Sequence, residues 1–150
     1  MSRRDSCGSD ERTEPGVAYR LRRGVRHISN QHRQLDVMVD SVFDALEAHM
    51  PRAAAVAFQR FRDALEAHFS LEESLYFPAL GGVVPELRDK LGSFVADHME
   101  LRGHLDGVDA ALDAGALDRA AQVLEELTRA LADHEAQEER TLAHLRPPRR

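Results

Sequence analysis

Apolar side chains recur three and four positions apart along most of the chain, which is the period of an amphipathic α-helix. The first series falls between about Tyr19 and Met50 and consists of Val25, Ile28, His32, Leu35, Val39, Val42 and Leu46. A second series follows Pro51, a residue suited to the first turn of a helix, and consists of Phe61, Leu65, His68, Glu72, Leu75 and Ala79. The two series predict two long helices joined by a short turn.

Two further series follow, each bounded by residues that interrupt helices. Pro78 and Gly81-Gly82 are expected to end the second helix, Pro85 to open the third, and Gly115 to close it. The third series consists of Leu87, Leu91, Phe94, His98, Leu101, Leu105, Val108 and Leu112. The fourth series consists of Leu117, Leu124, Leu127, Leu131, His134, Glu138, Thr141 and Leu145.

Short connections between long amphipathic helices make consecutive helices antiparallel neighbours. The sequence therefore predicts an all-α fold, an antiparallel up-down-up-down four-helix bundle over residues 17–146. Composition agrees, because only 5% of the residues are aromatic and Ala, Leu, Glu and Arg dominate. Residues 1–16 have almost nothing apolar to bury, so we expect a disordered N-terminal tail there, and a C-terminal tail at residues 147–150, which begin with two prolines.

Charge and cysteine content narrow the setting of the protein. A net charge of -6 argues against binding to nucleic acid, which needs a basic face. The single cysteine, Cys7, cannot form an internal disulfide, and the sequence contains neither the apolar run of a signal peptide nor one long enough to span a bilayer. We therefore expect a cytoplasmic protein that binds neither nucleic acid nor a membrane.

Polar residues occur at core positions of every predicted helix. Each inner face carries one histidine, and in two helices a glutamate follows one turn later: His32, His68, Glu72, His98, His134 and Glu138. A lone core histidine is more often hydrogen-bonded to a neighbour than bound to a metal, but four of them favour a metal site. An ionised carboxylate buried without a partner costs several kcal/mol, so the two glutamates need a compensating charge, which a metal ion supplies.

The helical rise of about 1.5 Å per residue tests whether these side chains lie at one depth. His32 and His68 each lie roughly 25 Å from the turn at Pro51, and His98 and His134 each lie about 24 to 28 Å from Gly115. Across the Gly81-Gly82 turn the depths agree within about one helical turn. We therefore expect all six polar residues to meet at one level of the bundle.

The types of ligand narrow the choice of metal. Imidazole and carboxylate without thiolate suit iron, manganese or zinc, whereas calcium and magnesium prefer oxygen ligands. Four imidazoles and two carboxylates are too many for one four-coordinate zinc, so two ions fit better. In the two HxxxE segments, His68 to Glu72 and His134 to Glu138, both side chains lie on one face of the helix, so the histidine can bind one ion while the glutamate bridges the pair.

The order H, HxxxE, H, HxxxE between about residues 16 and 145 resembles the hemerythrin-like family, specifically its HHE cation-binding branch. The resemblance implies two non-haem iron ions, oxo- or hydroxo-bridged, with His32, His68, His98 and His134 as terminal ligands and Glu72 and Glu138 as bridges. It departs from the oxygen-carrying hemerythrins, which have HxxxH in the third helix and HxxxxD in the fourth. Here Arg102 stands four residues after His98, so the fifth histidine is missing and coordination positions stay open.

Open positions favour reaction with hydrogen peroxide, nitric oxide or oxygen over reversible oxygen storage. The first hypothesis is a protective or redox protein in oxidative or nitrosative stress, and as an enzyme it would be a di-iron oxidoreductase that is catalase-like or handles nitric oxide. The alternatives are a module that senses or binds oxygen, nitric oxide or iron without turnover, and a helical interaction domain without metal. Tyr76, one turn after Glu72, is the candidate catalytic residue, as a hydrogen-bond donor, ligand or redox group.

Several other polar residues are weaker candidates for the same site. Glu139 approximates the HxxxxD spacing, but we expect it to remain outside the metal shell, and we expect Glu73 to be exposed. The remaining histidines are expected on outer surfaces or near helix ends: His27, His49, His104 and His144.

Overall fold

The computed structural model of the 150-residue chain describes residues 15–145, and of residues 15–19 and 21 it describes the backbone alone. The predicted tails therefore lie outside the described residues, except that the first helix already begins at Pro15, earlier than the pattern of apolar residues indicated. Cys7 and Pro147-Pro148 also lie outside the described part.

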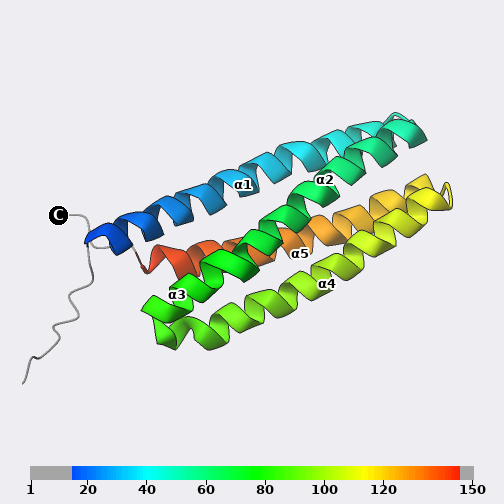
Figure 1. The fold of residues 1–150 in the computed structure, drawn as a ribbon. Coiled ribbons are helices and arrows are strands. Elements are labelled where there is room, and N and C mark those ends of the chain that lie inside the picture. The colour runs from blue at the N-terminus through cyan, green and yellow to red at the C-terminus, as the bar shows by residue number, and fades with distance from the viewer. Residues whose placement is uncertain (1–14, 146–150) are drawn as a thin grey trace, which may run out of the picture.

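Four helical rods form an antiparallel bundle, and the described residues contain no strand (Figure 1). The first rod is α1 (Pro15–Glu47), and the second consists of α2 (Pro51–Leu71), the π-helical turn η1 (Glu72–Tyr76) and α3 (Phe77–Val83). A 3-10 turn, η2 (Pro85–Leu87), leads into the third rod, α4 (Arg88–Asp113), and the fourth is α5 (Leu117–Ala143). The predicted all-α up-down-up-down bundle is confirmed.

The bundle consists of two helical hairpins packed together. Contacts are most extensive between α1 and α2 and between α4 and α5, and they are fewer where α1 meets α5 and where α2 meets α4. The larger apolar cluster includes Val42, Phe58 and Leu105 and lies toward the two hairpin turns. A smaller cluster lies toward the opposite end, around Phe77 and Phe94.

The second rod departs from the regular helix that the sequence predicted. Leu75 and Ala79 were expected on the inner face but are exposed, Leu75 to 54%, whereas Phe77 and Leu80 are buried. The cause is η1, because a π-turn adds one residue to the helix and rotates all later side chains.

The π-turn also explains why the predicted stop at Pro78 is wrong. Pro78 lies in the first turn of α3, where its missing N–H group is tolerated, and Gly81-Gly82 lie inside α3, which ends at Val83. A smaller difference occurs in α5, where Leu142 is buried and Thr141 is only partly buried.

The two hairpin turns have the same backbone geometry. In the first turn, His49 has a φ of 52°. Its N–H group donates a hydrogen bond to the carbonyl oxygen of Leu46, and the N–H group of Met50 donates to that of Ala45. In the second, Gly115 has a φ of 69°, and the equivalent bonds run from Gly115 to Leu112 and from Ala116 to Ala111. Both are Schellman C-caps, which require a left-handed residue and favour glycine.

His49 is therefore a residue at which glycine should stabilise the fold. We expect His49→Gly to raise the free energy of unfolding by about 1 kcal/mol, because a side chain strains the left-handed conformation. Gly115→Ala should lower it by a similar amount, and urea unfolding measures both. His49→Ala is the matched control and should change little, since the strain remains. A destabilised His49→Gly variant would contradict this account of the turn.

Candidate metal centre

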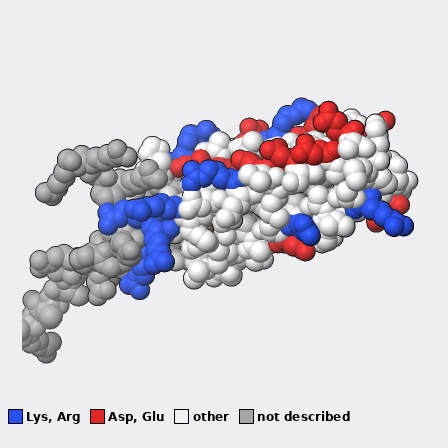
Figure 2. Space-filling view, turned by 90° about the horizontal axis from the view of Figure 1, so that it is seen from above, with Lys and Arg blue, Asp and Glu red and all other residues white. Residues whose placement is uncertain are grey.

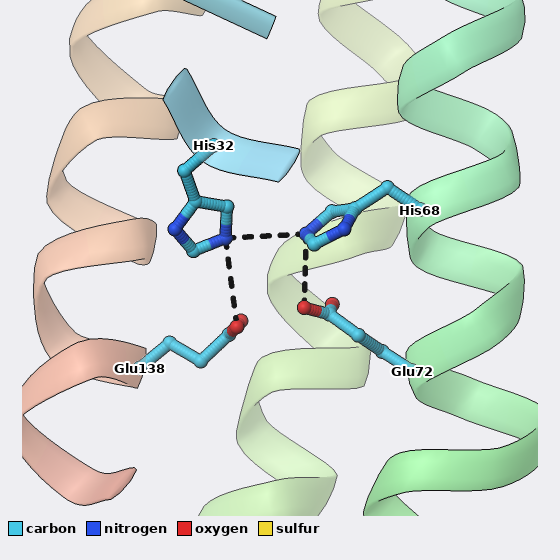
Figure 3. A group of neighbouring side chains, drawn as sticks. All are labelled: His32, His68, Glu72 and Glu138. Carbon is cyan, nitrogen blue, oxygen red and sulfur yellow. Dashed lines mark hydrogen bonds and ion pairs between the residues drawn. The ribbon is translucent and has the colours of Figure 1, made fainter. Parts of the chain in front are cut away.

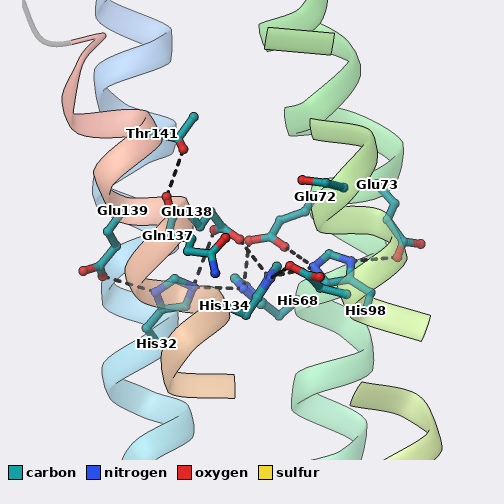
Figure 4. Close-up of polar contacts among 12 residues, drawn as sticks. His32, His68, Glu72, Glu73, His98, His134, Gln137, Glu138, Glu139 and Thr141 are labelled. Carbon is teal, nitrogen blue, oxygen red and sulfur yellow. Dashed lines mark hydrogen bonds and ion pairs between the residues drawn. The ribbon is translucent and has the colours of Figure 1, made fainter. Parts of the chain in front are cut away.

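The six polar residues that the sequence singled out lie together at one level of the bundle (Figures 3 and 4). All are buried, with exposed fractions between 0% and 3%. One comes from α1, two from the second rod, one from α4 and two from α5: His32, His68, Glu72, His98, His134 and Glu138. The expected meeting of these side chains is present, between the two apolar clusters.

The six residues form two groups that share both glutamates. His32 and His68 make one group with Glu72 and Glu138, and His98 and His134 make the other with the same two carboxylates. Within each group one ligand atom per residue lies within 4.8 Å of all the others. We name the groups by their histidines: the 32/68 position and the 98/134 position.

Each carboxylate points one oxygen at each position. Oε1 of Glu72 lies 2.9 Å from Nε2 of His68, and its Oε2 lies 3.1 Å from Nε2 of His98. Glu138 does the same, with Oε2 3.1 Å from Nε2 of His134 and Oε1 3.6 Å from Nε2 of His32. This is the arrangement that two bridging carboxylates need.

These carboxylate oxygens are buried, and none accepts a hydrogen bond from the described residues despite the short distances. The Nε2 atoms also crowd one another, at 3.2 Å between His32 and His68 and 3.1 Å between His98 and His134. Buried acceptors are normally paired, and an unpaired ionised group is costly. Converging imidazole and carboxylate lone pairs in an apolar core fit metal cations.

The outer ring nitrogen, Nδ1, of each of the four buried histidines lies beside a polar side chain. Nδ1 of His32 lies 3.2 Å from Glu139, and Nδ1 of His98 lies 2.8 Å from Glu73, as Figure 4 shows. In addition, Gln31 Oε1 lies 2.7 Å from Nδ1 of His68, and Asp97 Oδ2 lies 3.1 Å from Nδ1 of His134. A proton on Nδ1 donates to each of these oxygens and leaves Nε2 free to bind a metal.

These outer partners of the histidines were not predicted from the sequence, and the prediction that Glu73 is exposed was wrong. Glu73 is partly buried and also pairs with Arg102 at 3.0 Å. A signal was present in the sequence, because Gln31 and Asp97 directly precede two of the buried histidines, and Glu73 and Glu139 directly follow the two buried glutamates. On a helix such positions look like ordinary surface charges, so only the assembled bundle shows their role.

Arg102 stands four residues after His98, where the oxygen-carrying hemerythrins have a histidine, and it belongs to neither group. It pairs with Glu66 at 2.9 Å as well as with Glu73, and its guanidinium lies 5.2 Å from the centroid of the Phe69 ring. The other histidines, His27, His49, His104 and His144, belong to neither metal-binding group, and all but the partly buried His104 are exposed.

Tyr76 also lies outside both groups. Tyr76 is partly buried, and its ring meets the His27 ring edge-on with 6.4 Å between the ring centroids. A Cβ atom added at Gly24 would lie 3.4 Å from Cε1 of the Tyr76 ring. Burial and the nearby charge of Glu72 raise the pKa of the phenol, so it keeps its proton at neutral pH. Tyr76 lines a hollow of about 450 Å³ with Arg20, Arg23 and Arg26, at the basic end of the bundle (Figure 2).

Proton affinities at the centre reflect crowding of negative charge. Burial and the neighbouring Glu72 carboxylate raise the pKa of Glu138 to about 11. Burial alone would raise the pKa of Glu72 too, but contacts with His68 and His98 outweigh it and lower that pKa. Burial also lowers the pKa of His32 and His134, which keeps both imidazoles neutral.

Aromatic rings cover the centre on the α4 side, while a groove reaches it between α1 and α5. Phe69 stacks on His98 at 4.0 Å, and Phe94 meets His134 edge-on at 5.5 Å. The groove has a volume of about 690 Å³ and its wall includes the ligand candidate His32, together with Glu135 and Glu139. The groove therefore lies against His32, one of the four residues of the 32/68 position.

Comparison with known proteins agrees with this geometry. The family model described as the hemerythrin HHE cation binding domain matches residues 23–145. No curated protein and no solved structure matches the chain significantly. Among the described residues, no helix is both long and apolar enough to cross a membrane. The matched segment contains both HxxxE pairs and the two other buried histidines, and the chain belongs to the hemerythrin HHE cation-binding domain family.

Proposed function

We propose that the chain holds two non-haem iron ions through His32, His68, His98 and His134, with Glu72 and Glu138 bridging, and that it reacts with hydrogen peroxide, nitric oxide or oxygen. The supporting observation is the donor set, because each position offers two imidazoles and two carboxylate oxygens. Iron commonly takes six donors, so such a site leaves places for a small reactant. Bound iron would supply Lewis acidity and redox chemistry at those places.

Of these reactants, hydrogen peroxide suits the groove between α1 and α5 best. Its wall contains guanidinium, amide and carboxylate groups that donate and accept hydrogen bonds: Arg26, Asn30, Arg33, Asp36, Glu135 and Glu139. A polar molecule keeps its hydrogen bonds in such a passage, whereas nitric oxide and oxygen gain little from it. The role is therefore proposed to be protective and catalase-like.

The chain's own residues would orient the ligands and limit access of water. Glu139, Gln31, Glu73 and Asp97 fix the ring orientation of the four histidines through Nδ1. Phe69, Phe77 and Phe94 exclude solvent from the 98/134 position, since all three rings are buried against its histidines. Tyr76 is proposed to donate a hydrogen bond from the edge of the site.

Metal analysis tests the centre. We expect about two irons per chain in protein purified without chelator, with the ultraviolet-visible spectrum of an oxo- or hydroxo-bridged ferric pair. His98→Leu should lose most of the metal, because it removes one of only two imidazoles at its position. The matched control is His104→Leu on the same helix, which should keep the full metal content. Equal metal loss in both variants, or a metal-free wild type, would refute the proposed centre.

Peroxide consumption tests the proposed activity. The iron-loaded protein should consume hydrogen peroxide at least tenfold faster than the same concentration of free iron, whereas a His68→Leu, Glu72→Leu double variant should not exceed free iron. Tyr76→Phe should keep its iron and lower the rate severalfold if the phenol donates a hydrogen bond. A loaded protein no faster than free iron would rule out the enzyme and leave a binding or sensing module.

The proton on Glu138 should make the metal-free protein less stable in alkali. In the unfolded chain a glutamate has lost its proton well below pH 7, whereas in the metal-free fold the pKa of Glu138 is raised to about 11 and that of Glu135, mainly by burial, to about 8. The folded state therefore binds more protons, and the free energy of unfolding should fall by about 1 to 2 kcal/mol per pH unit from pH 7 to 9.

Bound metal should weaken this dependence, because it replaces the proton on Glu138. Urea unfolding at pH 7, 8 and 9 with and without metal measures both effects. Metal-free Glu138→Gln is the control, since glutamine cannot titrate, and its slope should be smaller than that of the wild type. Stability that rises from pH 7 to 9 in the metal-free protein would contradict the prediction.

A further inference from the structure

The two hairpins supply the same ligands but different outer partners. Gln31 directly precedes His32 and accepts a hydrogen bond from His68, the next ligand along the chain. Asp97 directly precedes His98 and accepts one from His134, which is again the next ligand. The histidines of each hairpin lie 36 residues apart, so Gln31 and Asp97 occupy equivalent places. One is a neutral amide and the other a carboxylate.

The remaining two partners do not cancel this difference. Glu139 accepts from His32 and Glu73 accepts from His98, so both are carboxylates. The 32/68 position thus has one carboxylate behind its imidazoles, and the 98/134 position has two. A carboxylate behind an imidazole makes the ring a stronger metal ligand than an amide oxygen does.

Charged groups farther from the centre also favour a cation at the 98/134 position. Behind the 98/134 position, the cation Arg102 pairs with Glu66 and Glu73, so these three groups keep one negative charge, and Asp97 adds a second. Beside the 32/68 position, Arg26 and Arg33 line the groove with Asp36, Glu135 and Glu139, so at most one negative charge there is left without a compensating cation. A divalent cation is therefore favoured at the 98/134 position.

We propose that the two positions bind divalent transition-metal ions unequally, and that the 98/134 position fills first and more tightly. Gln31 and Asp97 act as positioning residues that set this order through His68 and His134. The inference rests on the proposed two-metal centre and adds that its second ion, beside the groove, enters last and leaves first. The fraction of the 32/68 position that holds an ion would then depend on the concentration of free metal ion.

The isosteric pairs Gln/Glu and Asp/Asn allow a direct test on the metal-free full chain. Co²⁺ is titrated while visible absorption gives the affinities, and proton NMR shows which Nδ1–H signals acquire hyperfine shifts. In the wild type we expect two steps about tenfold apart or more. The first equivalent should shift the signals of His98 and His134.

The variants should change the order in a defined way. Gln31→Glu should strengthen the weaker step, and Asp97→Asn should weaken the stronger one, so that each brings the two affinities to within a few-fold. The double variant should restore two separated steps with the order reversed, so that the first Co²⁺ shifts the signals of His32 and His68. Gln122→Glu, an exposed site bonded to Arg119 on α5, is the matched charge control and should leave both steps unchanged.

The outcomes separate this inference from the proposed centre. A wild type that binds no Co²⁺ overturns the centre and the inference with it. Two ions bound with equal affinity, or a first ion at the 32/68 position, overturn the inference alone. The inference is also overturned if the double variant binds its first Co²⁺ at the same position as the wild type. Should Gln31→Glu fail to fold, Asp97→Asn still decides the question, because it must narrow the gap between the two steps.

Discussion

Two buried carboxylates that point all their oxygens at imidazole nitrogens determine how this protein is built. The oxygens of Glu72 and Glu138 have no hydrogen-bond donor among the described residues, and they lie in a core that is otherwise apolar. Without a cation, such a core accommodates the pair only by keeping a proton on Glu138, whose pKa is raised to about 11. The fold therefore holds two buried carboxylates in fixed positions without giving their oxygens a hydrogen-bond donor or a cation from the described side chains.

The bundle holds these carboxylates in place between two apolar layers. The larger apolar cluster fixes the hairpins from the turn end, and the smaller one closes the opposite end around Phe77 and Phe94. Between them, each histidine is held from outside by a side chain on a neighbouring helix: Glu139, Gln31, Glu73 and Asp97. These bonds link the helices at the level at which the six buried polar residues meet, so the orientation of the four imidazole rings depends on correct packing of all four rods.

Regular periodicity made most of this arrangement predictable, and departures from it caused the errors. Helix number, antiparallel order and the common depth of the six polar residues follow from a 3.6-residue repeat and the rise per residue. The π-turn at Glu72–Tyr76 breaks that repeat, so Leu75 and Ala79 were assigned to the wrong face. The partners of Nδ1 were missed for another reason, since Glu73 and Glu139 gain their role only from rings on other helices.

The same π-turn shows how the two similar hairpins acquire different properties. In α5 the buried residue after Glu138 is Leu142, four positions on, whereas after Glu72 it is Phe77, five positions on. Both belong to the smaller apolar cluster, so the extra residue is taken up without loss of packing, and Tyr76 is left at the edge beside Gly24. A single local change of this kind leaves the arrangement of the six buried polar residues intact. The surroundings of the 32/68 and 98/134 positions can therefore differ while Glu72 and Glu138 remain shared between them.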